Sequence, residues 1–401
     1  MKLSRNAKNA FMLGALCSIS YFAIYIARNI LGAVTPKIIE SGDFDEKMIG
    51  SMSAVYFATY AIGQLINGMV GDKIKAKYMI STGLIIAGIT NFIFPYMTFS
   101  VTAASAVYGL TGFSLAMIYA PMTKIVSENT EPIHAVRCSF GYTIASFFGT
   151  PAAGLLATYL AWKPVFTVTS FILVFMGALA FVFFTAFERR GIVKYGQYEK
   201  VKETGSIKTL VEHSIIRFSL ISIITGIIRT SVIFWLATYI TQYLKFDTET
   251  SGGIYTVATF IISLMSIIAI VIYEFFGRRR DFTIIIMFAC SVVFFLLTYL
   301  VYVPVLNIIF IVLAIMSSNG AAAILWSVYC PSLRDTGRVS SATGFLDFVS
   351  YMAAAAANLI FANAVSGIGW GNLILVWCGI VTLGLICAIP YKQLKSKPLS
   401  E

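Results

Sequence analysis

The chain has little charge and little of the chemistry that enzymes use. Asp, Glu, Lys and Arg make up only 12% of its 401 residues, against about 25% in a soluble globular protein. Its two histidines form no catalytic constellation with a carboxylate or a nucleophile, and its six cysteines form no Cys-x-x-Cys pair. A Walker-type Gly-x-x-x-x-Gly-Lys-Ser/Thr motif is also missing. We therefore expect no enzyme activity, no catalytic residue, no metal and no cofactor.

The sequence is instead rich in long apolar runs. Hydrophobic residues make up 58% of it, and about a dozen segments approach the roughly 20 apolar residues that a helix needs to span a bilayer. The alternation typical of a membrane β-barrel is not seen. The composition predicts an all-α membrane protein with twelve transmembrane helices in two six-helix bundles.

The basic residues fall mainly on one side of these predicted helices. If the N-terminus is cytoplasmic, we count 23 of the 29 Lys and Arg residues on cytoplasmic loops and tails, and only four on outer loops. This distribution accounts for the net charge of +11 without a nucleic-acid partner. It predicts a multi-pass protein of the cell (inner) membrane with both termini in the cytoplasm, in contact with the lipid bilayer.

The chain divides near its midpoint and repeats itself. A long polar, basic stretch predicts an N-terminal bundle at 1–188, a cytoplasmic linker at 189–213, and a C-terminal bundle with a short tail at 214–401. Arg229 follows Arg28 by 201 residues, and Glu274 follows Asp72 by 202. Offsets near half the chain length indicate an internal duplication, which many transporters contain.

Only three ionisable residues remain inside the predicted helices: Arg28, Arg229 and Asp347. A charge at the centre of a membrane helix costs about 2.5–3.5 kcal/mol, so it is a functional-site hypothesis. Tyr21 and Tyr25 share a helix face with Arg28. A guanidinium suits phosphate or carboxylate, and two arginines with one carboxylate leave a charge that favours an anion. Two alternatives stay open: Arg229 pairs structurally with Asp347, or Arg28 extends to the outer surface.

The second predicted helix carries a polar stripe. Tyr56, Tyr60, Gln64 and Asn67 recur at helical spacing, and such a face requires protein or water beside it rather than lipid. We expect it to line a cavity; hydrogen bonding between helices is the alternative. On the eleventh helix, Asp347 shares a face with Tyr351 and is a candidate proton site or counter-ion.

The segment from Gly68 to Lys77 resembles the signature loop of the major facilitator superfamily. Gly68, Asp72, Lys73 and Lys77 match the pattern, and the segment from Glu274 to Arg280 is a degenerate second copy. A carboxylate and cations at a helix end can latch one bundle to the other. The resemblance therefore implies a gating role for Asp72, Lys73, Lys77, Glu274 and Arg278.

Most of the chain is similar to the organophosphate:phosphate antiporters of that superfamily. These also carry Tyr-x-x-x-Tyr-x-x-Arg followed by proline, here Tyr21, Tyr25, Arg28 and Pro36, and the further positions that match are Arg229, Tyr60 and Tyr351. The resemblance implies that two arginines grip a phosphoryl group from opposite bundles. The chain departs from the family at three positions: Asn29, Gln64 and Ile144 stand where the family has a lysine, a basic residue and a histidine. It also adds Asp347.

These observations predict a secondary active transporter of a small organic anion. Our interpretation is a phosphate ester exchanged for inorganic phosphate by alternating access, with Arg28, Arg229, Tyr21, Tyr25, Tyr60, Gln64, Tyr351 and Asn29 as substrate-binding residues. One alternative is a proton-coupled carrier of another organic anion that uses Asp347. Another is a transporter-like sensor that binds its ligand without turnover. We expect a monomer.

Overall fold

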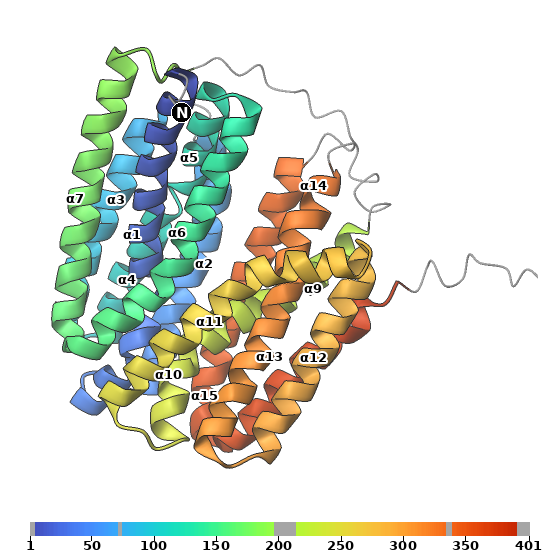
Figure 1. Cartoon of the computed structure of the whole chain (residues 1–401). Helices are drawn as coiled ribbons and strands as arrows, with labels where there is room; N and C mark the ends of the chain where they lie inside the picture. Colours follow the sequence, from blue (N-terminus) through green and yellow to red (C-terminus); the bar gives the residue numbers. More distant parts are fainter. Residues whose placement is uncertain (1–4, 71–73, 196–213, 334–338, 391–401) are drawn as a thin grey trace, which may run out of the picture. The chain divides into compact units, whose positions relative to one another are not determined.

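The computed structural model describes residues 5–70, 74–195, 214–333 and 339–390. These residues fold into helices joined by short turns, with no strand among them (Figure 1). Ten of the helices are long and apolar enough to cross a membrane. The last of these, Ala342–Ala388, contains Gly369 at φ 75°, so it is two successive helices. With the 28-residue helix Pro132–Tyr159, the predicted twelve-helix all-α fold is confirmed.

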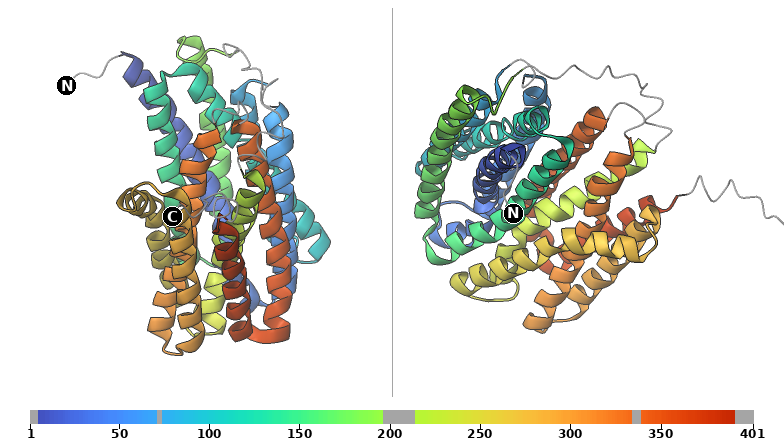
Figure 2. Two further views of the ribbon diagram at one scale, coloured as in Figure 1. Left: turned by 90° about the vertical axis from the view of Figure 1, so that its right-hand side faces the viewer. Right: turned by 45° about the horizontal axis from the view of Figure 1, so that its top comes forward.

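The chain forms two compact units. The first comprises Met1–Lys200 together with Phe234–Phe260 and Asn358–Asn363. Its first-half helices are α1 (Arg5–Ser41), α2 (Glu46–Val70), α3 (Ala76–Ile93), η1 (Phe94–Tyr96), α4 (Val101–Leu115), α5 (Tyr119–Asn129), α6 (Pro132–Tyr159) and α7 (Trp162–Arg189). Within this unit α1 packs on α6, α2 on α4 and α3 on α7, and the first pair lies side by side in Figures 1 and 2.

The second unit comprises Val201–Ile233, Ile261–Ala357 and Ala364–Glu401. The second half of the chain contains α9 (Ile215–Gly226), η2 (Ile227–Val232), α10 (Ile233–Gln242), α11 (Thr248–Phe275), α12 (Arg280–Leu300), α13 (Pro304–Ile324), η3 (Leu325–Tyr329), α14 (Cys330–Ser332) and α15 (Val339–Ala388). Of these, α12 packs on α13, and α9 with η2 runs without a break into α10. Helices α11 and α15 each contribute residues to both units.

Glycines set the close helix crossings in the first unit. A Cβ built on Gly149 of α6 would lie 2.3 Å from the Tyr25 Cβ on α1. A Cβ on Gly14 of α1 would lie 2.6 Å from the Cys138 Sγ on α6. Only a hydrogen fits at either position, so α1 and α6 approach closely along their length, as small residues allow in membrane helices. This contact fixes the α1 face that carries Tyr25.

Glycines also explain why second-half residues belong to the first unit. A Cβ on Gly50 of α2 would lie 2.2 Å from the Ala362 Cβ on α15, and one on Gly154 of α6 would lie 2.5 Å from the Thr256 Oγ1 on α11. The predicted bundle boundaries at residues 188 and 214 stay a prediction. Residues 196–213 of the predicted linker lie outside the described residues.

Candidate functional site

Arg28 is enclosed by aromatic rings from two helices of the first unit. Arg28 is only 7% exposed. The guanidinium carbon lies 5.2 Å from the ring centroid of Tyr25, 5.2 Å from that of Tyr60 and 5.7 Å from that of Phe57. Cation–π attraction of this kind is strongest where water is excluded. Helices α1 and α2 therefore hold the buried cation between ring faces, which we call the Arg28 cage.

A group of tyrosines continues from the Arg28 cage along α1. The centroid of the Tyr21 ring lies 5.0 Å from that of Tyr25, 5.5 Å from that of Tyr119 on α5 and 6.0 Å from that of Tyr142 on α6. The sequence interpretation missed Phe57 and Tyr119 as part of this site. Tyr119 did carry a signal, because the Tyr119-Ala-Pro segment has a counterpart in Tyr329-Cys-Pro.

The polar residues predicted beside Arg28 take different positions. The Asn29 side-chain amide donates a hydrogen bond to the Tyr25 carbonyl oxygen at 2.7 Å, so its nitrogen is used within α1. Gln64 is half-buried on α2. On the same α2 stripe, the Tyr56 ring stacks on Tyr108 of α4 at 4.7 Å. The α2 stripe therefore packs in part against α4.

Arg229 lies in a π-helical turn of the second unit. The turn is η2, between the α-helical segments α9 and α10. The i→i+5 hydrogen bonding of a π turn is rare, and such turns occur frequently at functional sites. The helix on both sides of Arg229 is anchored to α15: the hydroxyls of Ser222 and Ser231 donate to the carbonyl oxygens of Leu346 and Ala354 at 2.9 and 3.0 Å. The irregular turn thus occurs in a well-fixed helix.

Asp347 and Tyr351 lie on α15, which is the helix that packs against this π turn. Asp347 directly follows Leu346, which accepts the hydrogen bond from α9, and its side chain is half-buried. Tyr351 is buried. Arg229, Asp347 and Tyr351 therefore lie on two helices of the second unit that are in contact.

The residues predicted to form a gate are only partly described. Asp72 and Lys73 lie outside the described residues. The Glu188 carboxylate at the end of α7 accepts hydrogen bonds from Lys75 and from the buried Lys77. The Lys75 Nζ lies 2.6 Å from Glu188 Oε1. The hydrogen bond to Glu188 raises the pKa of Lys75 above its ordinary value. In this structure Lys77 therefore serves a contact inside the first unit, and its gating role stays a prediction.

The two residues predicted to gate in the second half, Glu274 and Arg278, form an exposed ion pair. Arg278 Nη2 lies 3.5 Å from Glu274 Oε1, one helical turn apart, and both side chains are largely exposed. Exposed pairs of this kind contribute about 0–1 kcal/mol to stability. The pair is therefore too weak by itself to fix the end of α11.

The chain shares sequence with several curated relatives, and three of them cover different fractions of it. It is 30% identical over 95 residues to the membrane sensor protein UhpC of Escherichia coli, which is 24% of this chain and 21% of that protein. It is 26% identical to the glycerol-3-phosphate transporter of Bacillus subtilis over 37% of this chain and 35% of that protein. The glucose-6-phosphate exchanger SLC37A2 of Bos taurus is 18% identical over 87% of this chain and 82% of that protein. The first of these matches thus spans only about a fifth of the relative's length.

Solved structures of other proteins share this fold, and a family sequence pattern matches most of the chain. The xylose transporter XylE from E. coli, in a partially occluded inward-open conformation, superposes with a TM-score of 0.75 at 11% identity, covering 98% of this chain and all of that one. The sequence pattern of the Major Facilitator Superfamily matches residues 17–358. That family consists of membrane transporters and not of enzymes. The chain belongs to the Major Facilitator Superfamily.

Proposed function

We propose that the protein is a secondary transporter that exchanges an organic phosphate for inorganic phosphate by alternating access. The observation that carries the proposal is the buried Arg28 guanidinium in its aromatic cage. The ring faces stabilise the cation without neutralising its charge. A positive charge in a low-dielectric site favours an anion, and the planar guanidinium fork suits a phosphate in particular.

The second half of the chain supplies the other proposed contacts. Arg229 in its π turn is the proposed second guanidinium, and the proposed partners on α15, which contacts this turn, are Tyr351 as a further contact and Asp347 as the counter-ion. Tyr21, Tyr25, Tyr60, Gln64 and Asn29 are the proposed contacts on the Arg28 side. Inorganic phosphate and a phosphate ester offer the same charged oxygens to the two arginines, so they compete for one site. That competition is the chemical basis of exchange.

The relatives support this substrate class and the proposed setting. One is named for glycerol 3-phosphate transport and another for glucose 6-phosphate exchange. Lys and Arg gather on one side of the predicted helices, which supports a cell-membrane protein with both termini in the cytoplasm. We propose that it acts as a monomer with an anionic substrate.

Counterflow in proteoliposomes tests the proposal. Vesicles preloaded with phosphate receive labelled glycerol 3-phosphate, glucose 6-phosphate or a dicarboxylate outside. Internal phosphate is expected to accelerate uptake of one of the phosphate esters. Arg28→Lys and Arg229→Lys are expected to reduce exchange about tenfold or more, because lysine loses the bidentate fork. Arg190→Lys, at an exposed position directly after α7, is the matched control. Full exchange in both Arg28→Lys and Arg229→Lys would exclude the two-arginine site.

A proton-coupled carrier is a second candidate because Asp347 is a half-buried carboxylate on α15. In that case an imposed pH gradient would drive uptake, internal phosphate would have no effect, and Asp347→Asn would abolish the response to the gradient. Under our proposal, Asp347→Asn keeps phosphate-driven counterflow.

A ligand sensor is a third candidate because UhpC, at 30% identity, is named a membrane sensor protein. A sensor would bind the phosphate ester with the same dependence on Arg28 but would show no flux. Binding measured by tryptophan fluorescence, alongside the counterflow assay, distinguishes the two functions.

A further inference from the structure

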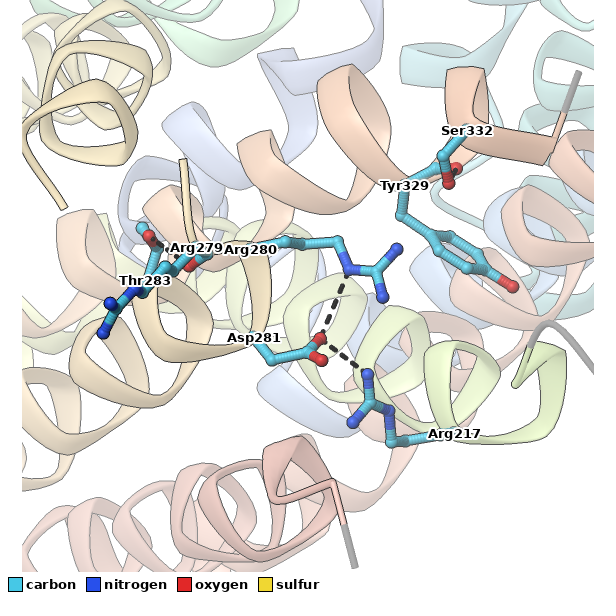
Figure 3. Close-up of polar contacts among 7 residues, drawn as sticks. All are labelled: Arg217, Arg279, Arg280, Asp281, Thr283, Tyr329 and Ser332. Carbon is cyan, nitrogen blue, oxygen red and sulfur yellow. Dashed lines mark hydrogen bonds and ion pairs between the residues drawn. The ribbon is translucent and has the colours of Figure 1, made fainter. Parts of the chain in front are cut away.

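Two arginines of the second unit meet on one carboxylate oxygen. Arg217, in the first turn of α9, places Nη2 2.6 Å from Asp281 Oδ1, and Arg280, which begins α12, places Nε 3.2 Å from the same oxygen (Figure 3). The group lies where α9 and α12 begin and η3 ends. We call Arg217, Arg280 and Asp281 the arginine pair site.

Aromatic rings hold both guanidinium groups in place. Phe218 and Tyr329 stack with their ring centroids 3.6 Å apart and their planes at 13°. The Arg217 and Arg280 guanidinium carbons each lie 4.8 Å from the Phe218 centroid, and Arg280 also lies 5.5 Å from that of Tyr329. Guanidinium groups fixed by stacking lose little entropy when they bind a ligand. The arginine pair site is therefore organised in advance.

The site keeps more positive charge than Asp281 can balance. Among the described residues, two guanidinium groups share one carboxylate, which leaves a local charge of +1. Within the described residues, Arg280 uses only its Nε in a hydrogen bond, and the buried Arg217 Nε has no hydrogen-bond partner. The arginine pair site thus has donors left for an anion.

The surroundings indicate which anion reaches these donors. The side chains of Arg217 and Arg280 are 18% and 30% exposed, so a ligand can contact them. Their neighbours Ile216, Leu220 and Phe282 are exposed apolar residues. On a membrane helix such residues face lipid, and the charged helix ends then lie at the level of the headgroups.

We propose that the arginine pair site binds a phosphate group, separately from the transport site. Phosphate offers several charged oxygens to the two guanidinium forks, which bind such oxygens bidentately. The source is either the headgroup of an acidic phospholipid or free phosphate. In either case the bound anion balances the remaining charge and ties the start of α9 to that of α12.

Titration of the purified full-length protein tests this site. Short-chain phosphatidylglycerol, short-chain phosphatidylcholine and inorganic phosphate are added separately in neutral detergent, and the apparent Kd is taken from the rise in unfolding temperature. Arg217→Gln and Arg280→Gln are expected to weaken binding about tenfold, or about 1.4 kcal/mol. Arg279→Gln is the matched control, since its side chain points away from Asp281 (Figure 3), and it is expected to change Kd less than twofold.

Asp281→Asn distinguishes an anion-binding site from a purely structural group of ion pairs. Removing the carboxylate leaves two uncompensated guanidinium groups, so anion binding should tighten severalfold even if the free protein is less stable. A response to phosphatidylglycerol that Arg280→Gln removes identifies the lipid as the source, and a response to phosphate that Arg280→Gln removes identifies the free anion. Unchanged affinity in Arg217→Gln and Arg280→Gln, equal loss in Arg279→Gln, or weaker binding in Asp281→Asn would overturn the proposal.

Discussion

The Ser231 hydroxyl donates a hydrogen bond to the Ala354 carbonyl oxygen at 3.0 Å. In a regular α-helix, residue 230 rather than residue 231 would face Ala354. Along α15 the contact positions rise in steps of four, through Leu346, Ser350 and Ala354. Along the facing helix the last step, from Gly226 to Ser231, is five residues. The π turn η2 holds the additional residue, so it realigns this helix with α15 and lies at Arg229.

Replacing Gly226 should disturb this alignment. A Cβ at residue 226 would lie 2.1 Å from the Ser350 Oγ and 2.9 Å from the Ser350 carbonyl oxygen. Overpacking of this kind costs about 1–3 kcal/mol. We expect Gly226→Ala to lower the unfolding temperature in detergent and to reduce counterflow, because η2 carries Arg229.

Gly379→Ala is the matched control for that substitution. It makes the same change in α15, where a Cβ would meet no atom within 4 Å. Alanine favours a helix over glycine by about 0.8–1.0 kcal/mol, so Gly379→Ala should leave the unfolding temperature unchanged or slightly higher. Equal effects of the two variants would contradict the packing argument.

The ring face of Tyr60, rather than its hydroxyl alone, should support Arg28. The guanidinium carbon lies 5.2 Å from the Tyr60 centroid, and a desolvated cation–π contact contributes about 2 kcal/mol. Tyr60→Leu removes the ring, so we expect counterflow with an organic phosphate to fall at least fivefold. Tyr60→Phe keeps the ring and should retain at least half of the activity. If phenylalanine is as damaging as leucine, the hydroxyl is the important group.

Local periodicity was enough to predict the helices and the face of Arg28. Apolar runs of membrane length indicate the spans directly, and a spacing of four and seven residues places Tyr21, Tyr25 and Arg28 on one side of a helix. The residues that share one side of a helix follow from the geometry of that helix alone. These features could therefore be predicted without knowing which helices pack together.

Features that depend on contacts distant in sequence could not be predicted. Phe57 joins the Arg28 cage only because α1 and α2 meet, and nothing in its own segment distinguishes it from other buried phenylalanines. The π turn at Arg229 reflects the register between two helices more than 100 residues apart. Glu188 lies 111 residues beyond Lys77, so their contact has no local signal.

Glu188 should stabilise the first unit by pairing with both lysines. Its carboxylate accepts from Lys75 and Lys77, and the Lys77 side chain is only 8% exposed. The hydrogen bond to the buried Lys77 contributes about 1.5–3 kcal/mol, and a buried cation that loses its partner is costly. We expect Glu188→Gln to lower the unfolding temperature by several degrees.

Lys75→Gln provides the comparison for Glu188→Gln. The Lys75 side chain is 48% exposed, and an exposed ion pair contributes little to stability because water screens the charges. Lys75→Gln should therefore shift the unfolding temperature by a degree or two at most. A shift as large as that of Glu188→Gln would mean that the buried Lys77 pair is not the dominant contact.

The Gly50 crossing should control access to the interior of the first unit. A Cβ on Gly50 would lie 2.2 Å from the Ala362 Cβ and 3.1 Å from the Asn358 carbonyl oxygen, so alanine forces α2 away from this part of α15. Ser53, one turn further along α2, is fully buried. In a protein whose native cysteines are replaced by alanine, a cysteine introduced at residue 53 should react slowly with a membrane-impermeant thiol reagent.

Adding Gly50→Ala should raise that labelling rate severalfold, since the crossing beside residue 53 is then open for more of the time. Gly253→Ala is the matched control, because a Cβ there would meet no atom within 4 Å on α11, and it should leave the rate unchanged. Added substrate should change the labelling rate of residue 53 less in the Gly50→Ala variant than in the parent protein, if the transporter alternates between states. Equal labelling in the parent and the Gly50→Ala variant would show that this crossing does not limit access.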